Sequence, residues 1–215
     1  GFAAQFSLPD GSKHNIATLN VPVFAAKDPD TFLGLLQASA PAADGKPDMA
    51  KLTAFKAAHP DTKPLEQWLG SHQPPYSYAT AEYFGIHTFY IRGKNGEQTK
   101  VRFQLKPQDG IKGLTDAELA DKNGDFLSQR LTERLQQGPV SFEWVVSFGQ
   151  LEDSVNDPTQ QWPDNRKTLT VGTLRLTSSG DDSCTKLNFD PNVLSSGFSA
   201  SDDPVLRMRS PAYAI

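Results

Sequence analysis

The sequence predicts an α+β fold, in which a long antiparallel β-sheet closes into a barrel, with helices inserted between its strands and at the C-terminal end. Three observations support this prediction. Several segments alternate apolar and polar residues with a period of two, which is typical of strands with one solvated face. An Asn-Gly turn joins two of these segments. Helix start and stop signals lie between the strands rather than in a separate block.

The clearest strands lie on either side of residues 93–96, a turn that ends in Asn95-Gly96. Asn-Gly is the pair preferred in the tight turns of β-hairpins. The strand after this turn alternates polar residues with Val101, Phe103 and Leu105. Residues 140–148 alternate in the same way. These patterns predict an antiparallel sheet with one face in solvent.

Weaker strand signals lie elsewhere in the chain. Residues 2–8, 21–25 and 184–189 can supply three more strands. In the strand predicted at residues 169–176, the apolar positions change parity at Gly172, which indicates a β-bulge. With this many strands in hairpins, we expect the sheet to close as a barrel.

Helix signals interrupt this strand pattern. Thr115 and Glu118 have the spacing of a capping box, and leucines recur every four residues at 127–135. Short helical pieces in a stretch rich in Pro and Ala predict a helical insertion at residues 30–80. We expect this insertion to lie within one domain that spans residues 1–215, since this length suits a single core.

The composition argues against several classes of function. The chain has 215 residues and a net charge of -4, and its lysines and arginines form no basic stripe, so we expect no nucleic-acid partner. No apolar run approaches the roughly 20 residues that a membrane span needs. The single cysteine, Cys184, excludes an internal disulfide and a cysteine-rich metal site.

Residues 189–213 carry the most informative pattern. An aspartate before Pro204 predicts a helix start, because proline is favoured at the first helical position. Arg209 and Tyr213 lie four residues apart, so they share one face of that helix. For an arbitrary pair with this spacing, a surface arginine packed on a tyrosine is the ordinary interpretation. The alternative is a metal-binding phenolate, to which a guanidinium supplies positive charge and hydrogen bonds.

The same residues resemble the segment that carries the proximal heme ligand in catalases. The shared pattern is F-D-P, then G, S, D and L, then R-x-x-x-Y, and it stands here without a gap at Phe189, Asp190, Pro191, Gly197, Ser201, Asp203, Leu206, Arg209 and Tyr213. Further matches extend over most of the chain and include Gly1-Phe2-Ala3, His87-Thr88-Phe89 and Gly110-Ile111-Lys112. Residues 41–84 match poorly and are shorter than in large catalases. These compact loops are most similar to the small bacterial catalase-related peroxidases.

The resemblance implies a heme b cofactor between the barrel and the C-terminal helix. Tyr213 would be the axial ligand of the iron, and Arg209 would hold it as a phenolate. Phe24 and Phe32 would line the heme pocket, although both would be ordinary core residues without heme. Pro211 differs from the commonest large catalases, and we expect it to kink the helix because it lacks an amide donor.

On the distal side of the heme the resemblance suggests one candidate, Asn20, which would orient peroxide by a hydrogen bond. A turn or strand-end role for Asn20 is weighted equally, and Leu19 can occupy the family position instead. The distal histidine of the family lies in an Arg-x-x-His-x-x-Gly segment, and none of the four histidines has this context. We therefore interpret the chain as an internal piece of a longer protein, which lacks the distal-histidine segment and the C-terminal end.

The resemblance implies a heme-dependent peroxidase that reduces hydrogen peroxide or organic peroxides with a small organic electron donor. Two alternatives stay open: a catalase proper, which disproportionates peroxide, and a non-catalytic heme-binding protein. A homo-oligomer is a further expectation. The sequence leaves the physiological reductant and the compartment open, and a periplasmic location is suggested only by the resemblance.

Overall fold

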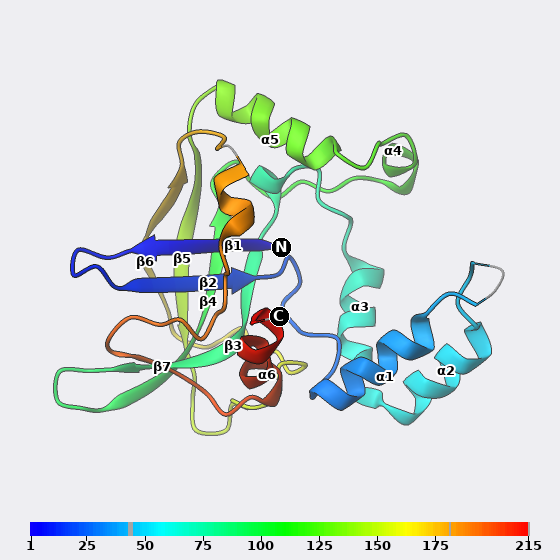
Figure 1. Cartoon of the computed structure of the whole chain (residues 1–215), viewed down its shortest axis with the longest axis horizontal. Helices are drawn as coiled ribbons and strands as arrows, with labels where there is room; N and C mark the ends of the chain where they lie inside the picture. Colours follow the sequence, from blue (N-terminus) through cyan, green and yellow to red (C-terminus); the bar gives the residue numbers. More distant parts are fainter. Residues whose placement is uncertain (43–44, 181, 215) are drawn as a thin grey trace.

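The computed structural model describes residues 1–42, 45–180 and 182–214, and it shows an antiparallel sheet with helices on its outer sides (Figure 1). The strands are β1 (Phe2–Ser7), β2 (Lys13–Thr18), β3 (Tyr83–Arg92), β4 (Gln98–Pro107), β5 (Val140–Phe148), β6 (Thr168–Leu176) and β7 (Phe198–Ala200). The α-helices are α1 (Pro29–Ser39), α2 (Met49–Ala58), α3 (Lys63–Ser71), α4 (Asp116–Ala120), α5 (Phe126–Gln136) and α6 (Pro204–Tyr213). Three 3-10 helices lie at Pro60–Thr62, Tyr78–Thr80 and Asp182–Lys186. The mixture of antiparallel strands and inserted helices confirms the predicted α+β class.

The described strands form two sheets rather than the closed barrel predicted from the sequence. A five-stranded sheet has the order β6-β5-β4-β3-β7, and β1 pairs only with β2. A single antiparallel bridge between Leu19 and Phe84 connects the hairpin to the larger sheet. Figure 1 shows the hairpin crossing in front of the larger sheet. The prediction of closure was wrong for the described residues because the hairpin covers the apolar face by packing across it.

The main core lies between this hairpin and the sheet. Its buried members include Ile16 of β2, Tyr83 of β3, Leu105 of β4 and Phe142 of β5. The apolar face of β1 packs against them through Phe2, Ala4 and Phe6. Two sheets whose strands cross bury their facing side chains in this way without sharing a hydrogen-bonded edge.

Several local predictions are confirmed. The turn at residues 93–96 joins β3 to β4, and the side chains of Thr115 and Glu118 form the capping box of α4. Trp144 pairs with Gly172 whereas Val145 pairs with Thr170, so β6 carries its bulge where the change of parity predicted it.

Two predicted strands are not formed. Residues 21–25 are irregular, since Pro22 has no amide to donate and the amide of Phe24 bonds to the carbonyl of Pro158 in a distant loop. Residues 184–189 begin in a 3-10 helix and continue as a loop, in which Asn188 accepts a hydrogen bond from the amide of Asp190. Side chains that bond their own backbone compete with strand pairing.

The helices between β2 and β3 occupy the region where the sequence predicts an insertion. α1 begins at Pro29 and is capped by Asp28, whose carboxylate accepts the amide of Thr31 at 2.7 Å. α1 packs on α2, and Gly34 permits a close approach to the ring of Phe55. No helix in the described part of the chain has the length and apolar character needed to cross a bilayer.

Candidate functional site

The candidate site is built around α6, which the sequence places through Asp203 and Pro204. The Asp203 carboxylate accepts the amides of Val205 and Leu206 at 2.9 and 3.3 Å, and Pro204 opens the first turn. Leu206 is fully buried in a second core cluster, where it packs against Phe89 of β3. A capped start and one buried leucine therefore fix α6 on the sheet.

Arg209 and Tyr213 meet on the exposed side of this helix, as their spacing predicts. The Arg209 Nη2 atom donates a hydrogen bond to the Tyr213 hydroxyl at 2.5 Å. Tyr213 remains 38% exposed. The arrangement holds the hydroxyl of this exposed tyrosine beside a fixed positive charge. Such an oxygen can bind a metal ion as an anion, because the guanidinium compensates part of the negative charge.

A buried hydrogen-bonded pair, His87 and Asp203, lies behind the same helix. His87 Nδ1 of β3 and the Asp203 carboxylate lie 2.7 Å apart, and both side chains are almost completely buried. Burial lowers the pKa of His87, the hydrogen bond and charge of Asp203 oppose this shift, and the charges of Arg209 and Arg102 add to it. The neutral imidazole donates its Nδ1 proton to the carboxylate, so Asp203 joins β3 to the first turn of α6.

The sequence includes His87 in the family resemblance but does not identify its partner. Asp203 is recognisable only as a helix cap, and the two residues are 116 positions apart. The sequence signals for the two are a histidine inside a strand and an aspartate before a proline. Neither signal indicates that the side chains meet.

Phe24 and Phe32, the predicted pocket residues, contact each other. Their ring centroids lie 4.8 Å apart at an interplanar angle of 49°, and both side chains are half-buried. Phe32 belongs to α1, which contacts α6. The structure thus brings the helix of Tyr213 next to the helix of one pocket candidate.

Asn20 lies in a different setting. It is exposed just after β2, where it lines an open hollow of about 1190 Å³ between the end of α3 and the loop at residues 111–116. The described residues show no contact between Asn20 and Tyr213. Leu19, the alternative for the same family position, is held by its backbone, which exchanges two hydrogen bonds with Phe84 at 2.7 and 3.0 Å.

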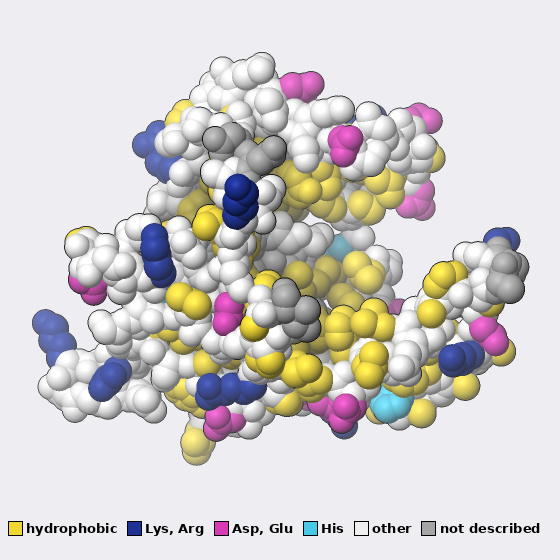
Figure 2. All heavy atoms as spheres, viewed as in Figure 1, with side chains coloured by type: hydrophobic (Ala, Val, Ile, Leu, Met, Phe, Trp, Pro, Cys, Tyr) yellow, Lys and Arg dark blue, Asp and Glu magenta, His cyan; other side chains and the backbone are white. Residues whose placement is uncertain are grey.

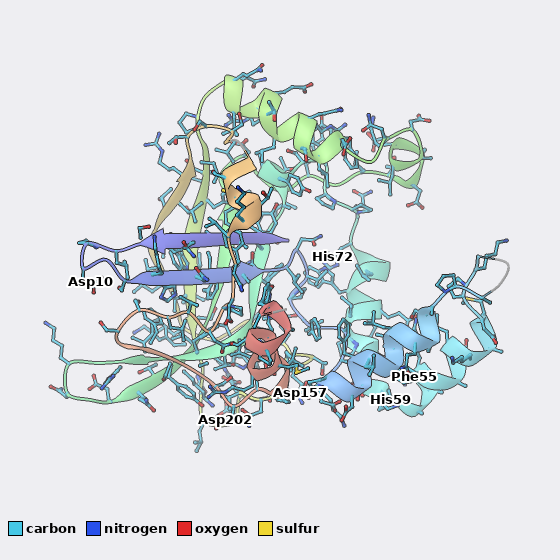
Figure 3. The ribbon with its side chains drawn as sticks, in the orientation of Figure 1. Asp10, Phe55, His59, His72, Asp157 and Asp202 are labelled. Atoms are coloured by element: carbon cyan, nitrogen blue, oxygen red, sulfur yellow. The ribbon has the colours of Figure 1, made fainter. Side chains whose placement is uncertain are left out.

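Aromatic side chains form part of the same hollow. The ring of Trp68 stacks on the ring of His72 with centroids 3.5 Å apart, and both residues line the hollow. Figure 3 places His72 at the end of α3 nearest the β1–β2 hairpin. The described residues contain no cluster of three or more His, Cys, Asp or Glu side chains that suits a metal ion. Tyr213 therefore remains the metal-ligand candidate that the sequence supplied.

Known sequences and structures resemble this chain over its whole length. The family model described as Catalase matches residues 1–214. A catalase-related peroxidase of Synechococcus elongatus is 41% identical over 219 residues, which cover 100% of this chain and 65% of that protein. A catalase-related peroxidase of Mycolicibacterium paratuberculosis is 33% identical over 222 residues, with coverage of 100% and 68%. The chain thus spans about two thirds of the length of these relatives.

The fold comparison agrees with the sequence comparison. A bacterial catalase superposes with a TM-score of 0.87 at 24% identity and covers 100% of this chain and 45% of its own. Catalase A of Saccharomyces cerevisiae superposes with a TM-score of 0.85 at 26% identity, and the match covers 100% of this chain and 47% of that protein. The family match and the relatives confirm the resemblance noted in the C-terminal segment, and the chain belongs to the catalase family.

Proposed function

We propose that this chain provides the proximal side of a heme site in a peroxidase, which reduces hydrogen peroxide or organic peroxides with a small organic donor. The observation that carries the proposal is the hydrogen bond from Arg209 to the hydroxyl of Tyr213 on a helix fixed at its start by Asp203. The name of two relatives, catalase-related peroxidase, supports the reaction class.

The residues around Tyr213 fit a heme group. A porphyrin needs apolar contacts for its faces and one or two axial ligands for its iron. Large apolar side chains are exposed on the two neighbouring helices: Leu33 and Leu36 on α1, and Met208 on α6. Figure 2 shows apolar surface over this part of the molecule. An anionic oxygen ligand beside an arginine, next to apolar helices, suits a ferric heme.

Heme, when bound, supplies the redox-active iron at which peroxide is reduced. Tyr213 would hold the iron through its phenol oxygen, and Arg209 would keep that oxygen negatively charged. Phe24 and Phe32 would pack against the ring and keep water from it. The buried pair of His87 and Asp203 would hold the start of α6 in place while the ligand end binds the cofactor.

Asn20 would orient the peroxide by donating a hydrogen bond from its amide. Its side chain is exposed and makes no hydrogen bond to another described residue, so the amide is available to a ligand. Among the described histidines, His87 bonds Asp203, His14 bonds Ser195, and His72 of the same hollow contacts Ser71 and the Trp68 carbonyl. The amide of Asn20 can donate a hydrogen bond but is not a base. We therefore assign the orientation of peroxide, and not proton transfer, to Asn20.

Heme binding by purified protein tests the ligand assignment. The full chain is loaded with hemin, and heme content and the absorption spectrum are compared for Tyr213→Phe and for Tyr90→Phe, a control in β3. We expect Tyr213→Phe to lose the tyrosinate-to-iron charge-transfer band and most of its heme, while Tyr90→Phe keeps both. Full heme content with an unchanged spectrum in Tyr213→Phe would contradict the assignment.

Peroxide disproportionation is the second candidate reaction, because the superposed structures are catalases. Oxygen evolution from hydrogen peroxide and oxidation of a phenolic dye separate the two reactions in the heme-loaded protein. We expect dye oxidation to dominate. Oxygen evolution without dye oxidation would replace the peroxidase proposal with the catalase alternative.

A further inference from the structure

The C-terminal end of α6 is held from outside by an asparagine. The Nδ2 atom of Asn188 donates a hydrogen bond to the backbone carbonyl of Tyr213 at 2.8 Å. The last four carbonyls of a helix have no partner within the helix, so an external donor at this place stabilises the helix end. Asn188 therefore contacts the backbone of the residue whose side chain is the candidate iron ligand.

A second asparagine of the same loop holds the middle of the helix. The Nδ2 group of Asn192 donates to the backbone carbonyl of Leu206 and to the hydroxyl of Ser210, both at 2.9 Å. Leu206 and Ser210 lie in the turn of the helix that also contains Arg209. The two asparagines are thus hydrogen-bonded to the segment of α6 that carries Arg209 and Tyr213.

This helix needs external support because Pro211 lies inside its last turn. Proline has no amide hydrogen, so the carbonyl of Arg207, four residues earlier, loses its helical donor. The helix nevertheless continues to Tyr213. The hydrogen bonds from Asn188 and Asn192 reach the helix at Tyr213 and at Leu206 and Ser210, on either side of this weakened turn.

The loop that carries these asparagines is fastened to β2 by Asn15, which is only 2% exposed. The Asn15 Nδ2 group donates to the carbonyls of Asn188 and Asp190 at 3.1 and 3.0 Å. Its Oδ1 atom accepts from the side chain of Gln5 at 3.1 Å. Every polar group of this buried amide is therefore paired, as a rigid anchor requires.

We infer that Asn188 and Asn192 are positioning residues for Tyr213 and that Asn15 anchors them to β2. This inference rests on the proposed role of Tyr213 as the heme ligand. The three asparagines form a brace for the ligand end of α6, while Asp203 and His87 fix its other end. With both ends held, the helix would present the Tyr213 phenol oxygen in one direction despite the proline.

Hydrogen exchange on the heme-free chain tests the brace without any heme chemistry. The variants are Asn188→Asp, which keeps the side-chain acceptor but loses the donor, and Asn192→Ala. The control is Asn95→Asp, the same change in the exposed β3–β4 turn. We expect the amides of residues 209, 210 and 212–214 to exchange about five- to tenfold faster in both variants, as the loss of one ordinary hydrogen bond predicts. Exchange equal to that of the control would overturn the brace.

The same asparagine variants in a Pro211→Ala protein test whether the proline is the reason that the helix depends on them. Pro211→Ala restores an amide that can bond the carbonyl of Arg207, so the helix end then depends less on the asparagines. We expect the effect of Asn192→Ala on exchange to fall at least about twofold in this background, as coupled sites require. An equal effect in both backgrounds would overturn the compensating role.

Spectra of the heme-loaded chain test the positioning role. We expect Asn188→Asp to shift the tyrosinate-to-iron band, while Tyr213→Phe removes it and Asn95→Asp leaves it unchanged. Faster exchange in Asn188→Asp with an unshifted band would overturn positioning. A wild-type protein without this band would contradict the proposed function instead, and the exchange data would still decide whether the brace exists.

Discussion

His87 and Asp203, 116 residues apart in the sequence, meet at 2.7 Å beneath the helix that carries Tyr213. Both side chains are removed from water, and the carboxylate serves two partners at once, the imidazole on one oxygen and the first amides of α6 on the other. The candidate ligand helix is therefore attached to β3 of the sheet through one aspartate.

Because Asp203 has both roles, replacing it should destabilise the protein much more than replacing the adjacent Asp202. Asp203→Ala removes a helix cap, worth about 1 kcal/mol, and leaves a buried imidazole donor unpaired, which costs about 1–3 kcal/mol. We expect a loss of about 2–4 kcal/mol in the free energy of unfolding, measured by urea denaturation. Asp202→Ala is the matched control, because Asp202 (Figure 3) is exposed and, among the described residues, pairs only with the exposed Arg207 at 3.0 Å. Equal losses in the two variants would contradict the account.

The stability of the fold should decrease in acid through His14. Burial lowers the pKa of the His14 imidazole from its ordinary value of 6.5. Its Nδ1 atom accepts the amide of Ser195 at 3.1 Å, and its ring lies between the rings of Phe6 and Phe198, with no charged partner among the described residues. A proton on Nδ1 would break the bond to Ser195.

Because the pKa of His14 is lowered in the folded state, protonation of His14 favours the unfolded state. Below pH 6.5 the unfolded state binds the proton more readily than the folded state, so stability is full above this pH and falls as the pH drops toward the lowered folded value. His87 contributes in the same direction. His14→Asn keeps an acceptor but does not titrate, so its unfolding free energy should fall less between pH 7 and 5. Identical pH dependence in wild type and variant would exclude His14 as a source.

The loop at residues 149–166 should depend on Arg166. Its guanidinium contacts the Asp153 carboxylate at 2.8 Å, and that side chain is 2% exposed. Arg166→Met would leave the buried carboxylate without its directly bonded partner, and breaking a buried pair in this way costs about 3–5 kcal/mol. Because Pro158 of this loop holds the backbone of Phe24, we also expect weaker heme retention. Arg207→Met, at an exposed pair, should change stability by less than about 1 kcal/mol. Denaturation curves that coincide for the two variants would refute this prediction.

Alanine substitutions at two helical glycines, Gly70 and Gly34, should have different effects on the stability of the protein. A methyl group on Gly70 of α3 meets nothing within 4 Å, so Gly70→Ala should stabilise the protein by about 0.5–1 kcal/mol through helix propensity. A methyl group on Gly34 of α1 would lie 2.6 Å from the ring of Phe55, and overpacking costs about 1–3 kcal/mol. Gly34→Ala should therefore be neutral or destabilising in thermal unfolding. A gain in Gly34→Ala equal to that in Gly70→Ala would show that α1 and α2 do not pack tightly.

Local features of the fold could be predicted from the sequence, because neighbouring residues determine them. The turn at Asn95-Gly96, the capping box at Thr115 and the start of α6 at Pro204 all follow from short patterns. The closed barrel was wrong because strand alternation shows which face is buried but not what covers it. Here the β1–β2 hairpin covers that face by crossing it.

The candidate site could be predicted only in part for the same reason. Arg209 and Tyr213 lie on one turn of one helix, so their spacing was sufficient. The hydrogen bonds of His87 to Asp203 and of Asn188 to Tyr213 join residues that are distant in the sequence, so no local pattern predicts them. The roles of Asn20, Phe24 and Phe32 in heme binding remain predictions.

The crystal structure of the chain loaded with heme tests the central claim most directly. We predict iron within bonding distance of the Tyr213 hydroxyl oxygen, with Arg209 hydrogen-bonded to that oxygen and α1 beside the porphyrin. Iron bound by a histidine, or heme at a site remote from α6, would contradict the account.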